Sequence, residues 1–181
     1  VHGYRGVTWT DSSGREQNPT LRLLGRNASE NDLVAVQQVR IVDKGHSRRF
    51  DVVLYVNGLP LVIVELKQAG TKQATVAKAH SQLGTYLHEF PLAFRTVVAT
   101  VVSDGLSAQY GTPFTPLHHY SPWTVDEGGV PVETGPATTE LETLAYGLFA
   151  PNRFLDVVTN FTAFDATKEG LVKRIAKPHQ Y

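Results

Sequence analysis

Hydrophobic and polar positions divide the chain into segments with two different periods. Short runs rich in valine, isoleucine and leucine predict strands, at residues 33–42, 51–56, 59–67, 96–102, 106–110 and 171–176. Apolar residues recur at helical spacing over residues 73–90, as one stripe of Val76, Leu83, Leu87 and Phe90. This alternation predicts an α/β fold in which helices flank a central mixed β-sheet.

Two shorter helices are expected in the last third of the chain. Thr139 and Glu142 have the spacing of a capping box, which predicts a helix that runs to about Phe149. Pro151 suits the first turn of a further helix, with Phe154 on its apolar side.

Composition limits the class of protein. The 181 residues suit one domain, and 17 basic against 17 acidic residues give no net charge. A globally basic nucleic-acid binder is therefore excluded, although a local basic patch is not. Cysteine is absent, which excludes disulfides and thiolate chemistry. The sequence shows neither a membrane span nor a secretory signal, so we expect a cytoplasmic protein with no membrane partner.

Loop-forming segments lie outside the predicted sheet and helices. Residues 1–30 form a loop-rich lead-in without sustained periodicity. Residues 112–136 contain five prolines and predict a long surface excursion, which Trp123 is expected to pin to the domain. The chain starts at Val1 and contains no methionine, which we interpret as a fragment of a longer protein.

Polar residues end two strands that the apolar pattern predicts to be central. Asp51 begins one strand, and Glu65 and Lys67 end the next one. Side chains alternate along a strand, so Glu65 and Lys67 share a face and Leu66 points away. Two carboxylates about 4 Å apart repel by roughly 1–4 kcal/mol, and a divalent cation such as Mg²⁺ reverses the sign of that interaction. The trio fits metal-assisted phosphodiester hydrolysis, and the alternative is a surface salt bridge of Lys67 with either acid.

The pairing register decides whether the two carboxylates can meet. A strict two-residue loop at Asn57-Gly58 pairs 56 with 59, and this places Asp51 and Glu65 on opposite faces. A shared site needs one bulge between them or a loop with an odd number of residues. Because Pro60 cannot donate to the ladder, we predict a loop over residues 57–59 that sets 51 opposite 65.

A polar row runs along the long predicted helix. Lys78, Gln82 and Tyr86 follow one another at intervals of four residues, beside the apolar stripe. An amide and a phenol can orient carboxylates or contact phosphate oxygens. The alternative is a solvated Gln82 and a half-buried Tyr86.

These residues resemble a known nuclease motif. Asp51, thirteen residues and then Glu65-Leu66-Lys67 resemble the PD-(D/E)xK motif, and residues 82–86 resemble the QxxxY motif of its RecB-like branch. Most of residues 31–181 are similar to the amino-terminal nuclease part of the restriction (R) subunit of type I restriction–modification enzymes. Phe50 stands where that family often has proline.

The resemblance implies a restriction-endonuclease-like core that cuts DNA. It implies that Asp51, Glu65 and the Leu66 carbonyl bind Mg²⁺, and that Lys67 positions the attacking water. The other two motif residues, Gln82 and Tyr86, would support the site or contact DNA.

The resemblance also implies a place in a larger assembly. Residues 31–176 would form the nuclease domain, and residues 177–181 would form a junction toward a helicase or translocase domain, which would bind ATP. Modification and specificity subunits are the implied partners. Two alternatives stay open: a non-catalytic docking module of the same complex, and a stand-alone repair nuclease with this core.

Three other candidates carry less weight. Arg48-Arg49 would meet phosphates or lie in a solvated turn. His118-His119 lack a third ligand nearby, so a zinc site is not expected. The family resemblance allows an additional upstream acid, for which Glu30 or Asp32 would be available.

Overall fold

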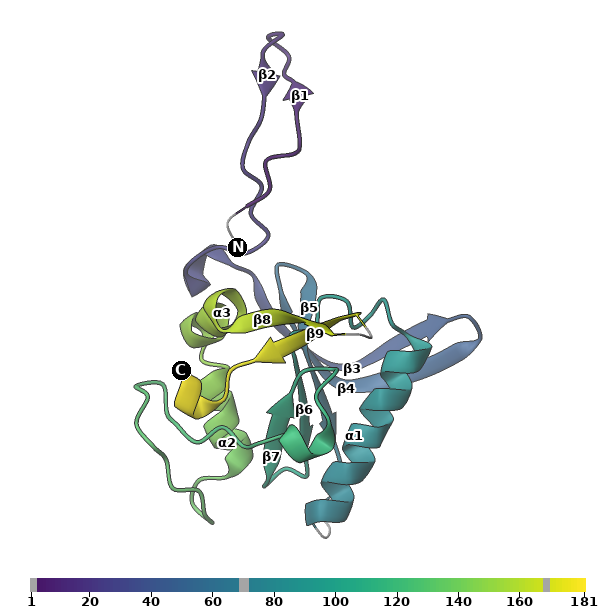
Figure 1. Cartoon of the computed structure of the whole chain (residues 1–181), viewed down its shortest axis with the longest axis vertical. Helices are drawn as coiled ribbons and strands as arrows, with labels where there is room; N and C mark the ends of the chain where they lie inside the picture. The colour runs from purple at the N-terminus through teal and green to yellow at the C-terminus, as the bar shows by residue number, and fades with distance from the viewer. Residues whose placement is uncertain (1–2, 69–71, 168–169) are drawn as a thin grey trace.

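A five-stranded mixed sheet forms the centre of the molecule. The computed structural model describes residues 3–68, 72–167 and 170–181. The sheet has the order β3-β4-β5-β6-β7, with strands β3 (Leu33–Asp43), β4 (His46–Val56), β5 (Leu59–Leu66), β6 (Ala99–Ser103) and β7 (Ala108–Gly111). Strands β5 and β6 are parallel and the other neighbours are antiparallel, which confirms the predicted mixed sheet. The parallel pair is joined through helix α1 (Lys72–Glu89), as such a crossover requires (Figure 1).

Helices cover both faces of this sheet. Val76, Leu83 and Leu87 of α1 pack in one cluster with Ile63 and Val102. The second face is covered by α2 (Glu140–Thr143), the π-helical turn η3 (Leu144–Leu148) and α3 (Pro151–Asn160). The sequence-based fold class, an α/β restriction-endonuclease-like core, is confirmed. Among the described residues, no helix is both long and apolar enough to cross a membrane.

Local signals in the second half of the chain are confirmed with small changes. The Thr139 side chain and the Glu142 side chain form both halves of the expected capping box. The helix after it is α-helical for only four residues and continues as the π-helical turn to Leu148. Trp123 is fully buried and holds the excursion, with its short helix η2 (Leu117–His119), against the domain.

Several elements lie outside the sequence-based prediction. Strand β4 begins at His46, earlier than expected, so that β3 and β4 form a ribbon that extends beyond the rest of the sheet (Figure 1). The lead-in, residues 1–30, contains a narrow hairpin that projects from the rest of the domain (Figure 1). The lead-in ends in a short helical turn. A second two-stranded sheet precedes the last helical turn. The elements that were not predicted are β1 (Trp9–Thr10), β2 (Glu16–Gln17), η1 (Ala28–Glu30), β8 (Thr162–Thr167) and η4 (Pro178–Gln180). The partner of β8 in its sheet, β9 (Gly170–Ile175), confirms the strand predicted at residues 171–176.

Candidate active site

A β-bulge brings Asp51 to the level of Glu65. The loop between β4 and β5 is the strict two-residue turn, since Val56 pairs with Leu59 and Asn57 has the positive φ of 51° that this turn needs. The register then shifts by one residue between Leu54 and Tyr55, so that Val52 pairs with Val64. The predicted loop over residues 57–59 is therefore wrong, and the alternative of one bulge is the form the chain adopts.

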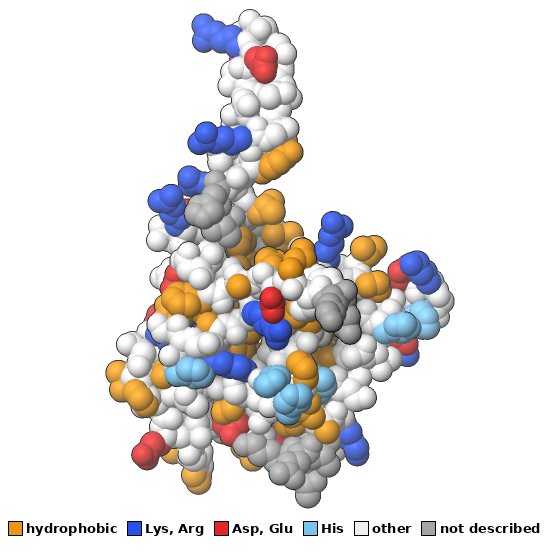
Figure 2. Space-filling view, viewed as in Figure 1, with side chains coloured by type: hydrophobic (Ala, Val, Ile, Leu, Met, Phe, Trp, Pro, Cys, Tyr) orange, Lys and Arg blue, Asp and Glu red, His pale blue; other side chains and the backbone are white. Residues whose placement is uncertain are grey.

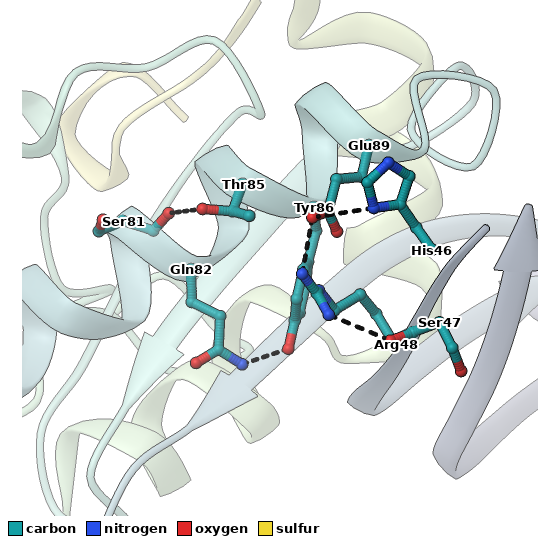
Figure 3. Close-up of polar contacts among 8 residues, drawn as sticks. All are labelled: His46, Ser47, Arg48, Ser81, Gln82, Thr85, Tyr86 and Glu89. Carbon is teal, nitrogen blue, oxygen red and sulfur yellow. Dashed lines mark hydrogen bonds and ion pairs between the residues drawn. The ribbon is translucent and has the colours of Figure 1, made fainter. Parts of the chain in front are cut away.

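Five residues that the sequence singled out lie in one connected group. Asp51 Oδ2 accepts a hydrogen bond of 2.8 Å from the Leu66 backbone N–H. Glu65 Oε1 accepts hydrogen bonds from the Lys67 ammonium and from the Gln82 amide. The same amide donates to the hydroxyl oxygen of Tyr86 (Figure 3). The middle of β4, the end of β5 and one face of α1 thus meet at a single point.

Glu65 is the most deeply buried ionisable group of the site. Its exposed fraction is 1%, whereas the side chain of Lys67 is 27% exposed. Burial raises the pKa of the Glu65 carboxyl, and the Asp51 carboxylate adds to this effect while the Lys67 ammonium opposes it. The ion pair that we considered as a surface salt bridge is present, but its acid is not at the surface.

The donor set fits a hard divalent cation. Glu65 Oε2 is buried and has no hydrogen-bond partner among the described residues. A second carboxylate lies beside it, and two like charges in one place favour a cation between them. The carbonyl of Leu66 remains a prediction as a third ligand. Within residues 3–68, 72–167 and 170–181, no group of three His, Asp or Glu side chains could hold a metal.

Tyr86 is positioned by packing as well as by its hydroxyl. It is only 6% exposed, and its ring centroid lies 5.1 Å from that of Phe50, which is itself buried. Burial and the nearby Glu65 raise the pKa of the Tyr86 phenol, so it keeps its proton at neutral pH. The alternative interpretation, a half-buried Tyr86, is wrong.

Sequence reasoning missed one residue of the site, Gln38. It lies in the edge strand β3 between the pairs Gln37–Val52 and Val39–Phe50, at the level of Asp51. Its amide Nε2 donates to Asp51 Oδ1 over 3.3 Å, and its φ is 56°. The only available signal was a pair of glutamines that interrupts an apolar run.

A basic residue adjoins the site at the start of β4. Arg48 lies in a strand, so the solvated turn is wrong, and its Nη2 is 2.6 Å from Glu89 Oε1. His46 Nδ1 lies 3.4 Å from the same oxygen (Figure 3). The exposed Arg49 is the cross-strand neighbour of Arg40.

The remaining acidic candidates lie elsewhere. Glu30 accepts hydrogen bonds within its own turn, from the Arg26 backbone N–H and the Asn27 amide. The backbone of Asp32 is bound to Asn57, at the end of the hairpin opposite Glu65. Neither joins the site.

Comparison with known proteins identifies the family. The family described as "Type I restriction enzyme R protein N terminus" matches residues 4–119. The chain is 34% identical over 173 residues to the type I restriction enzyme HindI endonuclease subunit of Haemophilus influenzae, covering 93% of this chain and 16% of that protein. It is 25% identical over 174 residues to a Methanocaldococcus jannaschii protein named as a candidate type I restriction enzyme MjaIXP endonuclease subunit, covering 86% of this chain and 17% of that protein.

The match to a third relative covers a larger share of that protein. The chain is 28% identical over 171 residues to the type I restriction enzyme EcoprrI endonuclease subunit of Escherichia coli, covering 89% of this chain and 50% of that protein. The chain thus spans half or less of each of these relatives. With the family match over most of its length, this chain belongs to the family of type I restriction enzyme R protein N-terminal domains.

Proposed function

We propose that this chain is a Mg²⁺-dependent endonuclease domain that hydrolyses phosphodiester bonds of DNA. The observation that carries the proposal is the convergence of Asp51, Glu65 and Lys67 at one point of the sheet, which depends on the bulge in β5. A structural protein has no need of a buried carboxylate with a free oxygen beside a second acid. The relatives' names as endonuclease subunits support a nuclease role.

Each residue has a distinct part in the proposed reaction. Asp51, Glu65 and the Leu66 carbonyl would hold Mg²⁺, which when bound stabilises negative charge on the phosphate oxygens and favours ionisation of water. The Lys67 ammonium, anchored on Glu65 Oε1, would orient the attacking water by its remaining N–H donors. Gln82 holds the same carboxylate oxygen and thereby leaves Oε2 available. The Tyr86 oxygen accepts from Gln82, so its O–H is available for a phosphate oxygen.

The wider assembly is part of the same proposal. We infer that the complete protein is the R subunit of an ATP-dependent type I restriction enzyme, in which ATP binds outside this chain. Residues 31–176 would be the nuclease domain and residues 177–181 the junction to the motor. DNA and the modification and specificity subunits are the proposed partners.

Substitution of the acid and the amine tests the proposal. Asp51→Asn keeps the shape of the side chain and an acceptor for the Leu66 N–H, but it removes the negative charge. We expect Asp51→Asn and Lys67→Ala to abolish Mg²⁺-dependent cleavage, while Glu133→Gln, at an exposed position, leaves it unchanged. Cleavage by Asp51→Asn at the unaltered rate would refute the assignment. A docking module would show no Mg²⁺ binding that depends on Asp51.

A further inference from the structure

A second polar feature adjoins the candidate site, on the surface between α1 and β4. It is an open hollow of about 520 Å³ with polar side chains around it. Its lining residues are Arg48, Lys78, Ser81, Gln82, Thr85 and Tyr86. Gln82 and Tyr86 also belong to the candidate site, and Gln82 contacts Glu65, so the hollow adjoins the candidate site. Figure 3 shows Gln82 and Tyr86 on α1 with Arg48 on the neighbouring strand.

One face of α1 supplies most of the hollow. Lys78, Ser81 and Thr85 follow one another at three- and four-residue spacing, which places them side by side on the helix, and all three are exposed. Thr85 Oγ1 donates to the Ser81 backbone carbonyl over 3.2 Å. Among the described residues, the Lys78 ammonium has no ion-pair or hydrogen-bond partner. This face therefore presents a free cation and the Ser81 hydroxyl, whereas the O–H of Thr85 is used within the helix.

Strand β4 supplies a second cation whose orientation is fixed. Arg48 Nη2 donates to Glu89 Oε1 over 2.6 Å and Nη1 donates to the Ser47 carbonyl over 3.2 Å. A guanidinium has five N–H donors, and no described residue accepts from the other three. The side chain is still 39% exposed. Glu89, the acid beside the hollow, is engaged by Arg48 and His46, so it holds the guanidinium in place.

The surroundings add positive charge. The distal half of the β3–β4 ribbon carries four basic residues and one acid, Asp43, in a protein with no net charge. Figure 2 shows Lys or Arg and His side chains at the end of this ribbon, with acidic side chains beside them. The basic residues are Arg40, Lys44, Arg48 and Arg49. A local positive field of this kind attracts a polyanion even where the whole chain is neutral.

We propose that the hollow binds a backbone phosphate of the DNA strand, next to the bond that is cut. This inference rests on the proposed function, and it places the substrate strand in the hollow between α1 and β4. A fixed guanidinium, a free ammonium and the Ser81 hydroxyl are donors suited to phosphodiester oxygens. Because these donors face a phosphate and not the edge of a base, the contact positions the strand and carries no sequence information.

The test measures DNA affinity without divalent cations. The full 181-residue chain is titrated with a short double-stranded DNA in EDTA, over a range of salt concentrations, so that neither cleavage nor a metal bridge to the carboxylates contributes. Lys78→Gln removes one cation and Ser81→Asp adds an anion to the hollow. The matched control is Arg95→Gln, which removes an exposed cation just before β6, at the end of the sheet opposite Glu65.

The expected results separate this inference from the proposed function. Lys78→Gln should weaken binding about 5-fold and lower the slope of log affinity against log salt by about 0.9, and Ser81→Asp should weaken binding by about 10-fold or more. Arg95→Gln should stay within about 2-fold of the unaltered chain. Equal effects of Lys78→Gln and Arg95→Gln, or no salt-dependent binding by the unaltered chain, would overturn the inference whether or not the chain cleaves DNA in Mg²⁺. If the unaltered chain did not cleave DNA in Mg²⁺, but Lys78→Gln still weakened DNA binding as expected, only the proposed function would be overturned.

Discussion

Gln38 and Asp51 lie at the same level of the neighbouring strands β3 and β4. At this point the regular alternation of side chains between the two faces of β4 is interrupted. Phe50 and Val53 both pack in the cluster against α1, although residues three apart on a regular strand face opposite sides. Across from this point, Gln38 has a φ of 56°, a conformation that costs a non-glycine residue about 1–2 kcal/mol. The irregularity allows Phe50 to anchor the core while Asp51 turns to the Leu66 amide.

Gln38→Gly separates the backbone role of this residue from its side-chain role. Glycine adopts the positive φ without strain but is less favourable in a strand, so the free energy of unfolding should change by less than about 1 kcal/mol. The amide that holds Asp51 Oδ1 is lost, and we expect Mg²⁺ affinity, measured by titration calorimetry, to fall about 10-fold.

Lys44→Gly is the matched control for that experiment. Lys44 also has a positive φ, of 46°, but it lies in the turn between β3 and β4. It should show a similarly small stability change and unaltered Mg²⁺ binding. If Gln38→Gly bound Mg²⁺ as tightly as Lys44→Gly, Gln38 would have no positioning role.

The pKa of Glu65 predicts how stability and metal binding depend on pH. Because burial raises this pKa in the folded protein, the folded state without metal favours the protonated carboxyl. The resulting stabilisation of the folded state is fully present at pH values below the pKa of Glu65 in the unfolded chain. It is lost as the pH rises through the higher pKa that Glu65 has in the folded protein. A cation binds the carboxylate, so Mg²⁺ affinity should increase over the same pH range.

Thermal unfolding in EDTA measures this linkage. The difference in melting temperature between the unaltered chain and Glu65→Gln should shift with pH in favour of Glu65→Gln as the pH rises, because the amide does not ionise. Magnesium should stabilise only the unaltered chain. A difference that is constant from acidic to alkaline pH would contradict the linkage.

Most residues of the candidate site could be singled out from the sequence, because they are polar positions that stand out from the apolar patterns of a strand and of a helix. Glu65 and Lys67 end a strand that is otherwise apolar, and Gln82 and Tyr86 repeat at the helical interval. What it did not show is where the extra residue of the hairpin lies. The sequence-based prediction places Pro60 directly after a three-residue loop, opposite Val56. In the structure Pro60 pairs with Tyr55, and the bulge directly after it accommodates its missing N–H.

Gln38 and strand β8 escaped prediction for a different reason. A left-handed residue in a strand is set by the packing on both sides of it, and glutamine has no local preference that marks it. Strand β8 is exposed over most of its length, so it lacks the alternation by which a half-buried strand is recognised. The conformation of Gln38 thus depends on tertiary contacts, whereas β8 is missed because it is exposed.

Lys67→Met should destabilise the protein in a pH-dependent way. The buried Glu65 carboxylate loses its cation, which should cost about 1–3 kcal/mol at pH 8 and little at pH 5, where the carboxyl can be protonated. The double variant Lys67→Met/Glu65→Gln removes both charges and should recover most of the stability at pH 8. Urea unfolding at the two pH values measures this. If the single and double variants were equally unstable at pH 8, lost packing of the lysine and not the uncompensated charge would be the cause.

Phe50 provides the last prediction, because it joins the core to the site. Its ring lies 5.1 Å from Tyr86 and 5.8 Å from Phe94, measured between centroids. Phe50→Leu and Phe94→Leu should each cost about 1–2 kcal/mol in urea unfolding, since both rings are buried. Only Phe50 is adjacent to Asp51 and packs on Tyr86, so Phe50→Leu should lower the rate of Mg²⁺-dependent DNA cleavage more than Phe94→Leu at matched stability. Equal losses of cleavage would show that the two rings act only through the stability of the core.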